Sequence, residues 1–333
     1  MNSYEKDSQW DITISFSWGG WLEMYSFGIA HALVQSGMLT RWEKEGKRVR
    51  FVGASTGALV AVCLAIGQHD FEAIYNYMAE CASQYRSSFW SFTHAEKFLK
   101  DAIAKFGDNL QDIDHNPQLL RRLEEGSLEV VLTELPRLSP RLINSFKTYE
   151  DLLEALNASF CLAPLAGVPV KLRKTGKWVM GGGISNFTPR MCEQNVLSVS
   201  AMYFHDTTIH PRKFVPSWWV LFPPPGRKYK SLFWMGYNDM IEFLMSDGKL
   251  SSIQAQLLFK PHVNFKIYDT YFELFTSFAL EFTVLIWLRP VIYICIIVNF
   301  FLLMMWHLCK NMTNHIRRLF YNIYISLHSA IYR

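Results

Sequence analysis

The chain has 333 residues, enough for one large α/β domain or two small ones. Half of its residues are hydrophobic, and its formal net charge of +4 is too small to indicate a nucleic-acid partner. Its six cysteines form no CxxC pair, which argues against a zinc site and for reduced side chains in the cytosol.

The first residues carry charge early and contain no apolar stretch, so we expect no signal peptide. Residues 12–16 are the first predicted strand, and they run through Gly19-Gly20 into a helical pattern. A second strand at 49–52 leads through a turn at 53–57 into an apolar helix at 58–66. A helix this apolar is expected to be buried against a sheet.

The rest of the first 250 residues continues this alternation. Further strands are expected at 128–132, 141–146, 178–180 and 196–199. Further helices are expected at 71–106, 152–156 and 236–250, the second of them capped by Thr148. Strands alternating with helices predict a mostly parallel sheet covered on both faces.

The character of the chain changes after about residue 268. Residues 290–308 contain no Asp, Glu, Lys or Arg, and about 20 apolar residues are needed to cross a bilayer. This segment predicts a spanning helix, or a hairpin that breaks at Arg289-Pro290 and enters one leaflet; a buried core helix is the alternative. Residues 283–333 hold no acid and five basic residues, which suits an anionic membrane surface. We therefore assign 268–333 to a hydrophobic membrane or lipid-droplet anchor with a basic amphipathic tail.

The turn after the second strand carries the pattern Gly53-x-Ser55-x-Gly57. In a nucleophile elbow the glycines are needed because the turn is sharp and a side chain at either position would clash. Such a turn lifts Ser55 to the edge of the sheet, at a helix N-terminus that favours developing negative charge. The alternative is a structural glycine turn with an ordinary N-cap serine.

Gly19 and Gly20 form a second glycine turn between a strand and a helix. Its free N–H groups suit an oxyanion. Dinucleotide binding would need G-x-G-x-x-G and an acidic residue at the end of the next strand, and the sequence has neither. The two turns together indicate a hydrolase with an oxyanion loop and a nucleophile elbow.

Four stretches resemble patatin-like phospholipases, most of all the adipose triglyceride lipase and adiponutrin branch. They are 14–28 (ISFSWGGWLEMYSFG), 51–60 (FVGASTGALV), 144–189 with its GGGISNFTP end, and 236–248. The likeness covers residues 8–252 and implies a three-layer α/β/α domain there. It also implies a Ser–Asp dyad that cleaves acyl esters of glycerolipids, with Ser55 as nucleophile and Gly19 and Gly20 at the oxyanion hole.

The sequence departs from the family pattern where the chemistry is concentrated. Gly181 stands at the position of the dyad Asp and Phe187 at that of a family Asn, while Trp18 and Glu23 stand at glycine positions. A general base contributes typically 10²–10⁴-fold, so its loss would leave Ser55 an ordinary alcohol. Glu23 is a candidate substitute carboxylate; the alternative is a surface or capping carboxylate near a helix N-terminus.

Two functions follow as expectations. The first is a serine acylglycerol lipase of the triacylglycerol lipase type, acting on neutral lipid or phospholipid esters at a membrane or lipid-droplet surface. The second is a catalytically impaired pseudolipase that binds lipid surfaces or regulates a protein partner. Both place the protein on the cytoplasmic side of lipid droplets or the endoplasmic reticulum. Neither needs a metal, a cofactor or nucleic acid.

Overall fold

The computed structural model describes residues 10–68, 70–87, 112–162, 167–260 and 267–283, with isolated residues at 101, 105 and between 286 and 312. The chain divides into two compact units, Met1–Glu281 and Phe282–Arg333. Most of the second unit, including most of the predicted 290–308 segment, lies outside the described residues. Within those that are described, no helix combines the length and apolarity needed to cross a bilayer.

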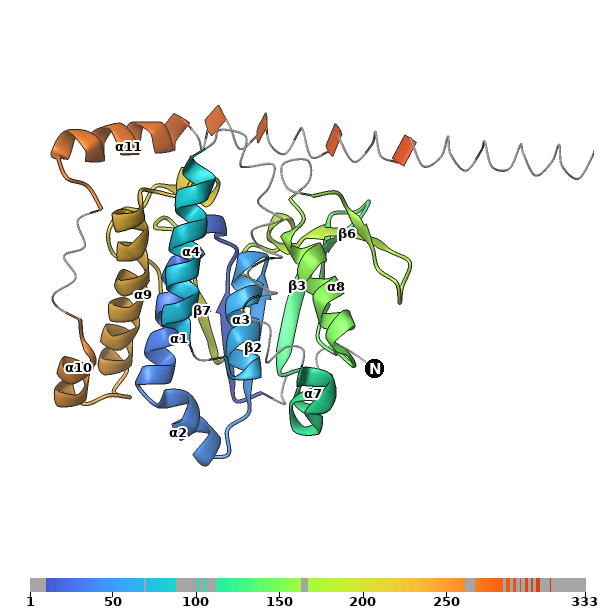
Figure 1. The fold of residues 1–333 in the computed structure, drawn as a ribbon, viewed down its shortest axis with the longest axis horizontal. Helices are drawn as coiled ribbons and strands as arrows, with labels where there is room; N and C mark the ends of the chain where they lie inside the picture. Colours follow the sequence, from blue (N-terminus) through green and yellow to red (C-terminus); the bar gives the residue numbers. More distant parts are fainter. Residues whose placement is uncertain are drawn as a thin grey trace, which may run out of the picture. The chain divides into compact units, whose positions relative to one another are not determined.

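The described part of the first unit holds a seven-stranded sheet (Figure 1). Its strands are β1 Ile12–Phe16, β2 Val49–Ala54, β3 Leu128–Glu134, β4 Ser139–Ile143, β5 Val170–Lys171, β6 Trp178–Gly181 and β7 Val196–Val199. Their order is β5-β6-β3-β2-β1-β7, with β4 also paired to β3. The α/β class and the positions of the predicted strands are confirmed.

The prediction of a mostly parallel sheet is wrong, because the sheet is mixed. β7, β1, β2 and β3 pair in parallel, whereas β4 and β6 both pair with β3 antiparallel and β5 pairs with β6 antiparallel. The turn between β3 and β4 is too short for the crossover that a parallel pair requires. The parallel part is therefore the half of the sheet that carries both glycine turns.

Helices surround this sheet in the order α1 Met24–Gln35, α2 Met38–Lys44, α3 Thr56–Ile66, α4 Phe71–Arg86, α7 Pro117–Glu124, α8 Tyr149–Phe160, α9 Gly226–Ser246, α10 Ser252–Leu258 and α11 Tyr271–Thr283. α3 packs on β2 and α8 on β3 (Figure 1). Thr148 caps α8 as predicted, by accepting the N–H of Asp151 at 3.2 Å. α9 starts ten residues earlier than the sequence predicts, directly after Pro225, because proline is tolerated at a helix start.

Helices α1 and α9 touch backbone to backbone at two glycines. A Cβ at Gly28 would lie 1.8 Å from the Phe233 carbonyl oxygen, and one at Gly236 would lie 2.0 Å from that of Tyr25. The Tyr25 hydroxyl donates to Asp239 Oδ2 at 2.8 Å across the same crossing. α1 follows the Gly19-Gly20 turn, so this crossing fixes the helix that continues from it.

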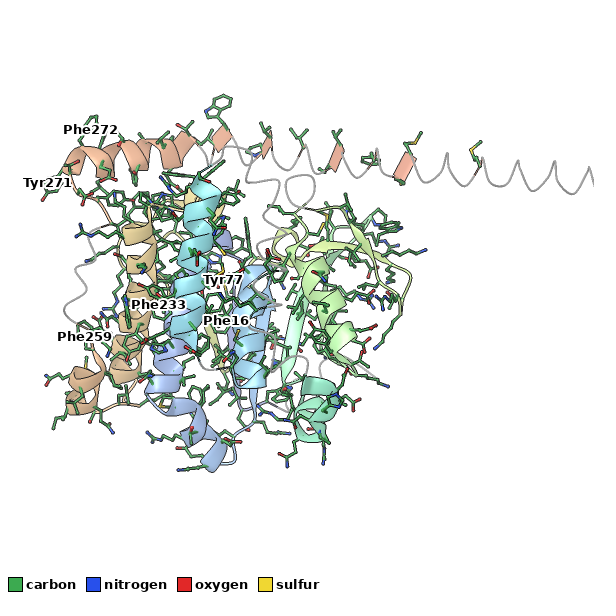
Figure 2. All side chains as sticks on the ribbon, in the orientation of Figure 1. Phe16, Tyr77, Phe233, Phe259, Tyr271 and Phe272 are labelled. Carbon is green, nitrogen blue, oxygen red and sulfur yellow. The ribbon has the colours of Figure 1, made fainter. Side chains whose placement is uncertain are left out.

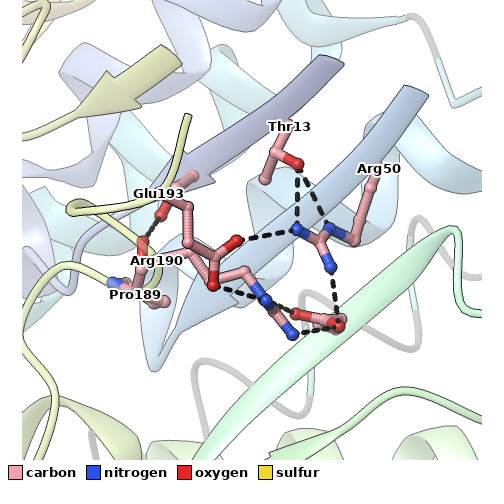
Figure 3. Close-up of polar contacts among 7 residues, drawn as sticks. Thr13, Arg50, Pro189, Arg190 and Glu193 are labelled. Atoms are coloured by element: carbon pink, nitrogen blue, oxygen red, sulfur yellow. Dashed lines mark hydrogen bonds and ion pairs between the residues drawn. The ribbon is translucent and has the colours of Figure 1, made fainter. Parts of the chain in front are cut away.

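A buried ion network holds together the ends of β1, β2 and β3 opposite the glycine turns (Figure 3). Arg50 on β2 donates to Thr13 on β1 at 3.0 Å and to Glu129 on β3 at 3.4 Å, and both charged side chains are buried. Arg190 also donates to Glu129, at 2.9 Å. The network thereby ties the segment that follows Pro189 to the start of the sheet.

Candidate active site

Ser55 lies between β2 and α3 in a strained conformation, with φ 52° and ψ −128°. A side chain rarely adopts this region, and it persists where the surroundings enforce it. The surroundings do so here, because a Cβ at Gly53 would lie 2.4 Å from the Gly57 carbonyl oxygen, and one at Gly57 would lie 2.4 Å from that of Ser17. The close approach of Gly57 brings the start of α3 against the end of β1.

A buried serine that the sequence did not single out supports this turn. The Ser55 N–H donates to Ser159 Oγ at 2.8 Å, and the Ser159 hydroxyl donates to the Val131 carbonyl at 2.8 Å. Ser159 lies near the end of α8, about a hundred residues away in the chain, so no local pattern identifies it. Among the described residues the Ser55 hydroxyl itself makes no hydrogen bond to a carboxylate.

The Gly19-Gly20 turn lies beside this serine turn. Gly20 has φ +53°, and a Cβ there would lie 2.3 Å from the Val220 carbonyl oxygen, so the position favours glycine on both grounds. The Gly19 N–H donates to Thr56 Oγ1 at 3.3 Å, and Thr56 directly follows Ser55. Within the described residues the Gly20 N–H has no acceptor, which leaves it available to an oxyanion.

Glu23 lies under the same turn and is 2% exposed, so it is not the surface carboxylate of the alternative interpretation. Its Oε2 accepts from the Thr56 hydroxyl at 3.5 Å and lies 2.5 Å from where a Gly19 Cβ would stand. Its Oε1 has no partner in the described part of the chain. Burial raises the pKa of Glu23 to about 8, and the nearby hydroxyl groups of Ser26 and Thr56 offset only part of that shift. The carboxyl is therefore protonated at neutral pH.

Comparison with known proteins decides the family. A model of patatin-like phospholipases matches residues 14–191, which include both glycine turns. The chain belongs to the patatin-like phospholipase family. Human patatin-like phospholipase domain-containing protein 4 is 28% identical over 259 residues, covering 71% of this chain and 98% of that protein.

One solved structure is similar at a much greater distance. VipD from Legionella pneumophila matches with a TM-score of 0.33 and 16% identity, over 57% of this chain. This chain spans about half of VipD, 49% of its length. A similarity at that level supports nothing about the site.

Residues 181–189 form the segment that is expected to carry the dyad Asp in a patatin-like phospholipase. In this chain, hydrogen bonds of the Gly181 backbone hold the start of the segment in place. The Gly181 N–H donates to the Cys161 carbonyl at 2.7 Å, and its own carbonyl accepts from Thr133 at 2.6 Å. A Cβ at Gly181 would lie 2.7 Å from the Cys161 carbonyl oxygen. The backbone around Gly181 therefore leaves little room for a side chain.

Two departures from the family pattern contact each other beside this segment. The rings of Trp18 and Phe187 meet edge to face with centroids 5.5 Å apart. The Trp18 ring also fills the space over Gly183, where a Cβ would lie 2.4 Å from Trp18 Cγ. The His205 ring packs on Phe187 with ring centroids 4.5 Å apart. The sequence analysis singled out both residues but could not predict their contact.

Proposed function

We propose that the protein is a serine acyl hydrolase of glycerolipids. In this proposal the Ser55 Oγ attacks the ester carbonyl and forms an acyl-enzyme, the alcohol leaves with a proton, and water then releases the fatty acid. The carrying observation is the strained Ser55 backbone at the N-terminus of α3, together with the hydrogen bond from the Gly19 N–H to Thr56, the residue after Ser55. Backbone donors aimed at a developing oxyanion can supply a large part of the rate enhancement.

Gly181 in place of the dyad Asp is a further part of the proposal. Glu23 is not placed as that base, because no hydrogen bond within the described residues joins its carboxyl to Ser55, and its raised pKa of about 8 leaves it mostly protonated at neutral pH. Through Thr56, Glu23 instead contacts the Gly19-Gly20 turn, which we call the oxyanion turn. We therefore expect slow turnover, lower by roughly the 10²–10⁴-fold that a general base supplies. Residual activity would come from the oxyanion donors and from substrate binding.

Neutral lipids such as triacylglycerol, or phospholipid esters, are the proposed substrates, and the cytoplasmic side of lipid droplets or the endoplasmic reticulum is the proposed location. Support comes from the family's phospholipase description and from the acid-free, basic sequence of residues 283–333. The segment 268–333 is proposed to attach the protein to that surface. A co-regulatory protein partner remains part of the proposal.

A fluorophosphonate probe on the full chain tests the nucleophile. The probe should label the protein, and Ser55→Ala should abolish labelling. Ser87→Ala, which changes an exposed serine, should leave labelling intact. The proposal that Ser55 is the nucleophile of a hydrolase would be overturned if Ser55→Ala were still labelled. It would also be overturned if the unchanged protein bound lipid but were not labelled.

The second candidate is a lipid-binding pseudolipase. It is favoured by the Trp18–Phe187 pair, which fills space beside the expected acid position, and by the absence of a carboxylate on the Ser55 hydroxyl within the described residues. This function predicts that Ser55→Ala binds lipid vesicles as well as the unchanged protein does. Turnover of a lipid ester that Ser55→Ala abolishes would exclude it.

A further inference from the structure

Helix α11 is amphipathic, but it buries polar side chains and exposes apolar ones, whereas a helix that packs on a core does the opposite. Its polar side chains face the body of the first unit, since Ser277 and Glu281 are buried and Glu273 is partly buried. Its aromatic side chains face outward, with Phe272, Phe275 and Phe278 exposed by 76%, 70% and 50%. A surface helix of a globular protein normally buries its apolar stripe. The apolar stripe of α11 therefore needs another partner.

Specific polar contacts fix this orientation. Glu281 Oε2 accepts the Ser217 N–H at 2.6 Å, although the Glu281 side chain is 2% exposed. Glu273 forms an ion pair with Lys228 of α9, and its N–H donates to the Thr270 hydroxyl at 3.1 Å. A helix held by its polar stripe cannot turn its phenylalanines inward without breaking these contacts.

The outward aromatic surface extends beyond the helix. Phe204, which is 60% exposed, lies 6.3 Å from Phe278 between ring centroids, and Phe214 lies 5.4 Å from Phe278. Figure 2 shows Phe272, near the start of α11, on the side of the helix away from α9. Contiguous exposed apolar surface of this kind marks an interaction site.

The helix is also linked to the candidate active site. Ser217, which Glu281 holds, opens the short 3-10 helix η6 Ser217–Val220. At the other end of η6, the Val220 carbonyl lies 2.3 Å from where a Gly20 Cβ would stand. The buried polar face of α11 is thus connected through one hydrogen bond and the four residues of η6 to the Gly19-Gly20 turn.

We propose that the outward face of α11, extended by Phe204, inserts into an anionic lipid surface and orients the Ser55 turn toward it. The choice of a lipid as the partner rests on the proposed function, and the role of α11 extends that function. Charge favours lipid over a second copy of the chain, because α11 leads directly into residues 283–333, which hold five basic residues and no acid. Exposed aromatic rings at a helix surface suit the headgroup region of a membrane.

The test places an environment-sensitive fluorescent amino acid at position 275 of the full chain. The matched control places it at 257, because Leu257 is 79% exposed on α10. Vesicles of phosphatidylcholine and phosphatidylserine should shift the emission at 275 to the blue and leave 257 unchanged. Both proteins carry Ser55→Ala, so that the result does not depend on hydrolysis and its failure leaves the proposed function standing.

Flotation with the same vesicles gives a second measurement. Phe272→Ser with Phe275→Ser should weaken vesicle binding at least about tenfold, because burying each ring contributes roughly that much or more. Ile253→Ser with Leu257→Ser on α10 should not weaken it. An unshifted emission at 275 in protein that floats with vesicles would show that another segment binds. A blue shift at 275 that appears without vesicles when the protein concentration is raised would show self-association. Either result would overturn the proposal.

Discussion

Glu23→Gln is the sharpest test of how the oxyanion turn is built. The wild-type carboxyl is buried, and burial raises its pKa from 4.5 to about 8. Below pH 4.5 it is protonated in the folded and the unfolded chain alike. Between pH 4.5 and 8 the unfolded chain releases a proton that the folded chain retains, so this contribution to stability is lost as the pH rises through that window.

The size of the effect follows from the shift in pKa. Each pH unit corresponds to 1.36 kcal/mol, so a shift from 4.5 to about 8 removes up to roughly 5 kcal/mol from the free energy of unfolding. Glutamine has nearly the same shape and does not titrate. Glu23→Gln should therefore gain on the wild type steadily from pH 5 to pH 8, by several kcal/mol in total.

Urea denaturation of both proteins across pH 5–8 measures this difference. Glu43→Gln is the matched control, because Glu43 is exposed on α2 and its substitution should leave the pH profile of the wild type unchanged. If the Glu23→Gln and wild-type stabilities differ by the same amount at pH 5 and pH 8, the carboxyl does not titrate as a buried group and the reasoning fails.

Three further substitutions test the packing around the site, each by urea denaturation. Gly28→Ala should lower the free energy of unfolding by about 1–3 kcal/mol or more, because its Cβ would overlap the α9 backbone. The control Gly226→Ala, whose Cβ meets nothing within 4 Å, should be neutral or stabilising. Equal losses in the two variants would contradict the α1–α9 contact. Glu129→Gln should lower the free energy of unfolding by less than the about 3–5 kcal/mol of a fully broken buried ion pair, because Glu193 still pairs with Arg50 and Arg190; no loss would contradict the buried network. Gly181→Asp should cost about 1–3 kcal/mol, because its Cβ would crowd the Cys161 carbonyl; no loss would show that the segment adapts.

The sequence predicts the first half of the fold well because its signals are local. The strand at 12–16 is apolar and ends in glycines, and the observed β1 has the same bounds. The turn at Gly53-x-Ser55-x-Gly57 also lies where a strand meets a helix. The short turn between β3 and β4 is a local signal of antiparallel pairing, whereas the antiparallel pairing of β6 with β3 joins segments far apart in the chain and could not be predicted from local patterns.

The candidate site could be predicted only in part for the same reason. Ser55 and the two oxyanion glycines follow from motifs that are contiguous in the chain. The burial of Glu23, the support from Ser159 and the Trp18–Phe187 contact depend on segments far apart in sequence. A carboxylate one turn after a glycine pair reads as a capping residue, and only tertiary packing shows that it is buried.

The most direct measurement is a crystal structure of the protein after reaction with a fluorophosphonate. It would show whether the two glycine turns act on one reacting group. We expect phosphorus bound to the Ser55 Oγ and one phosphoryl oxygen within about 2.7–3.1 Å of the Gly20 nitrogen. A phosphoryl oxygen that points away from the Gly20 amide, or an adduct on another residue, would contradict a shared oxyanion site.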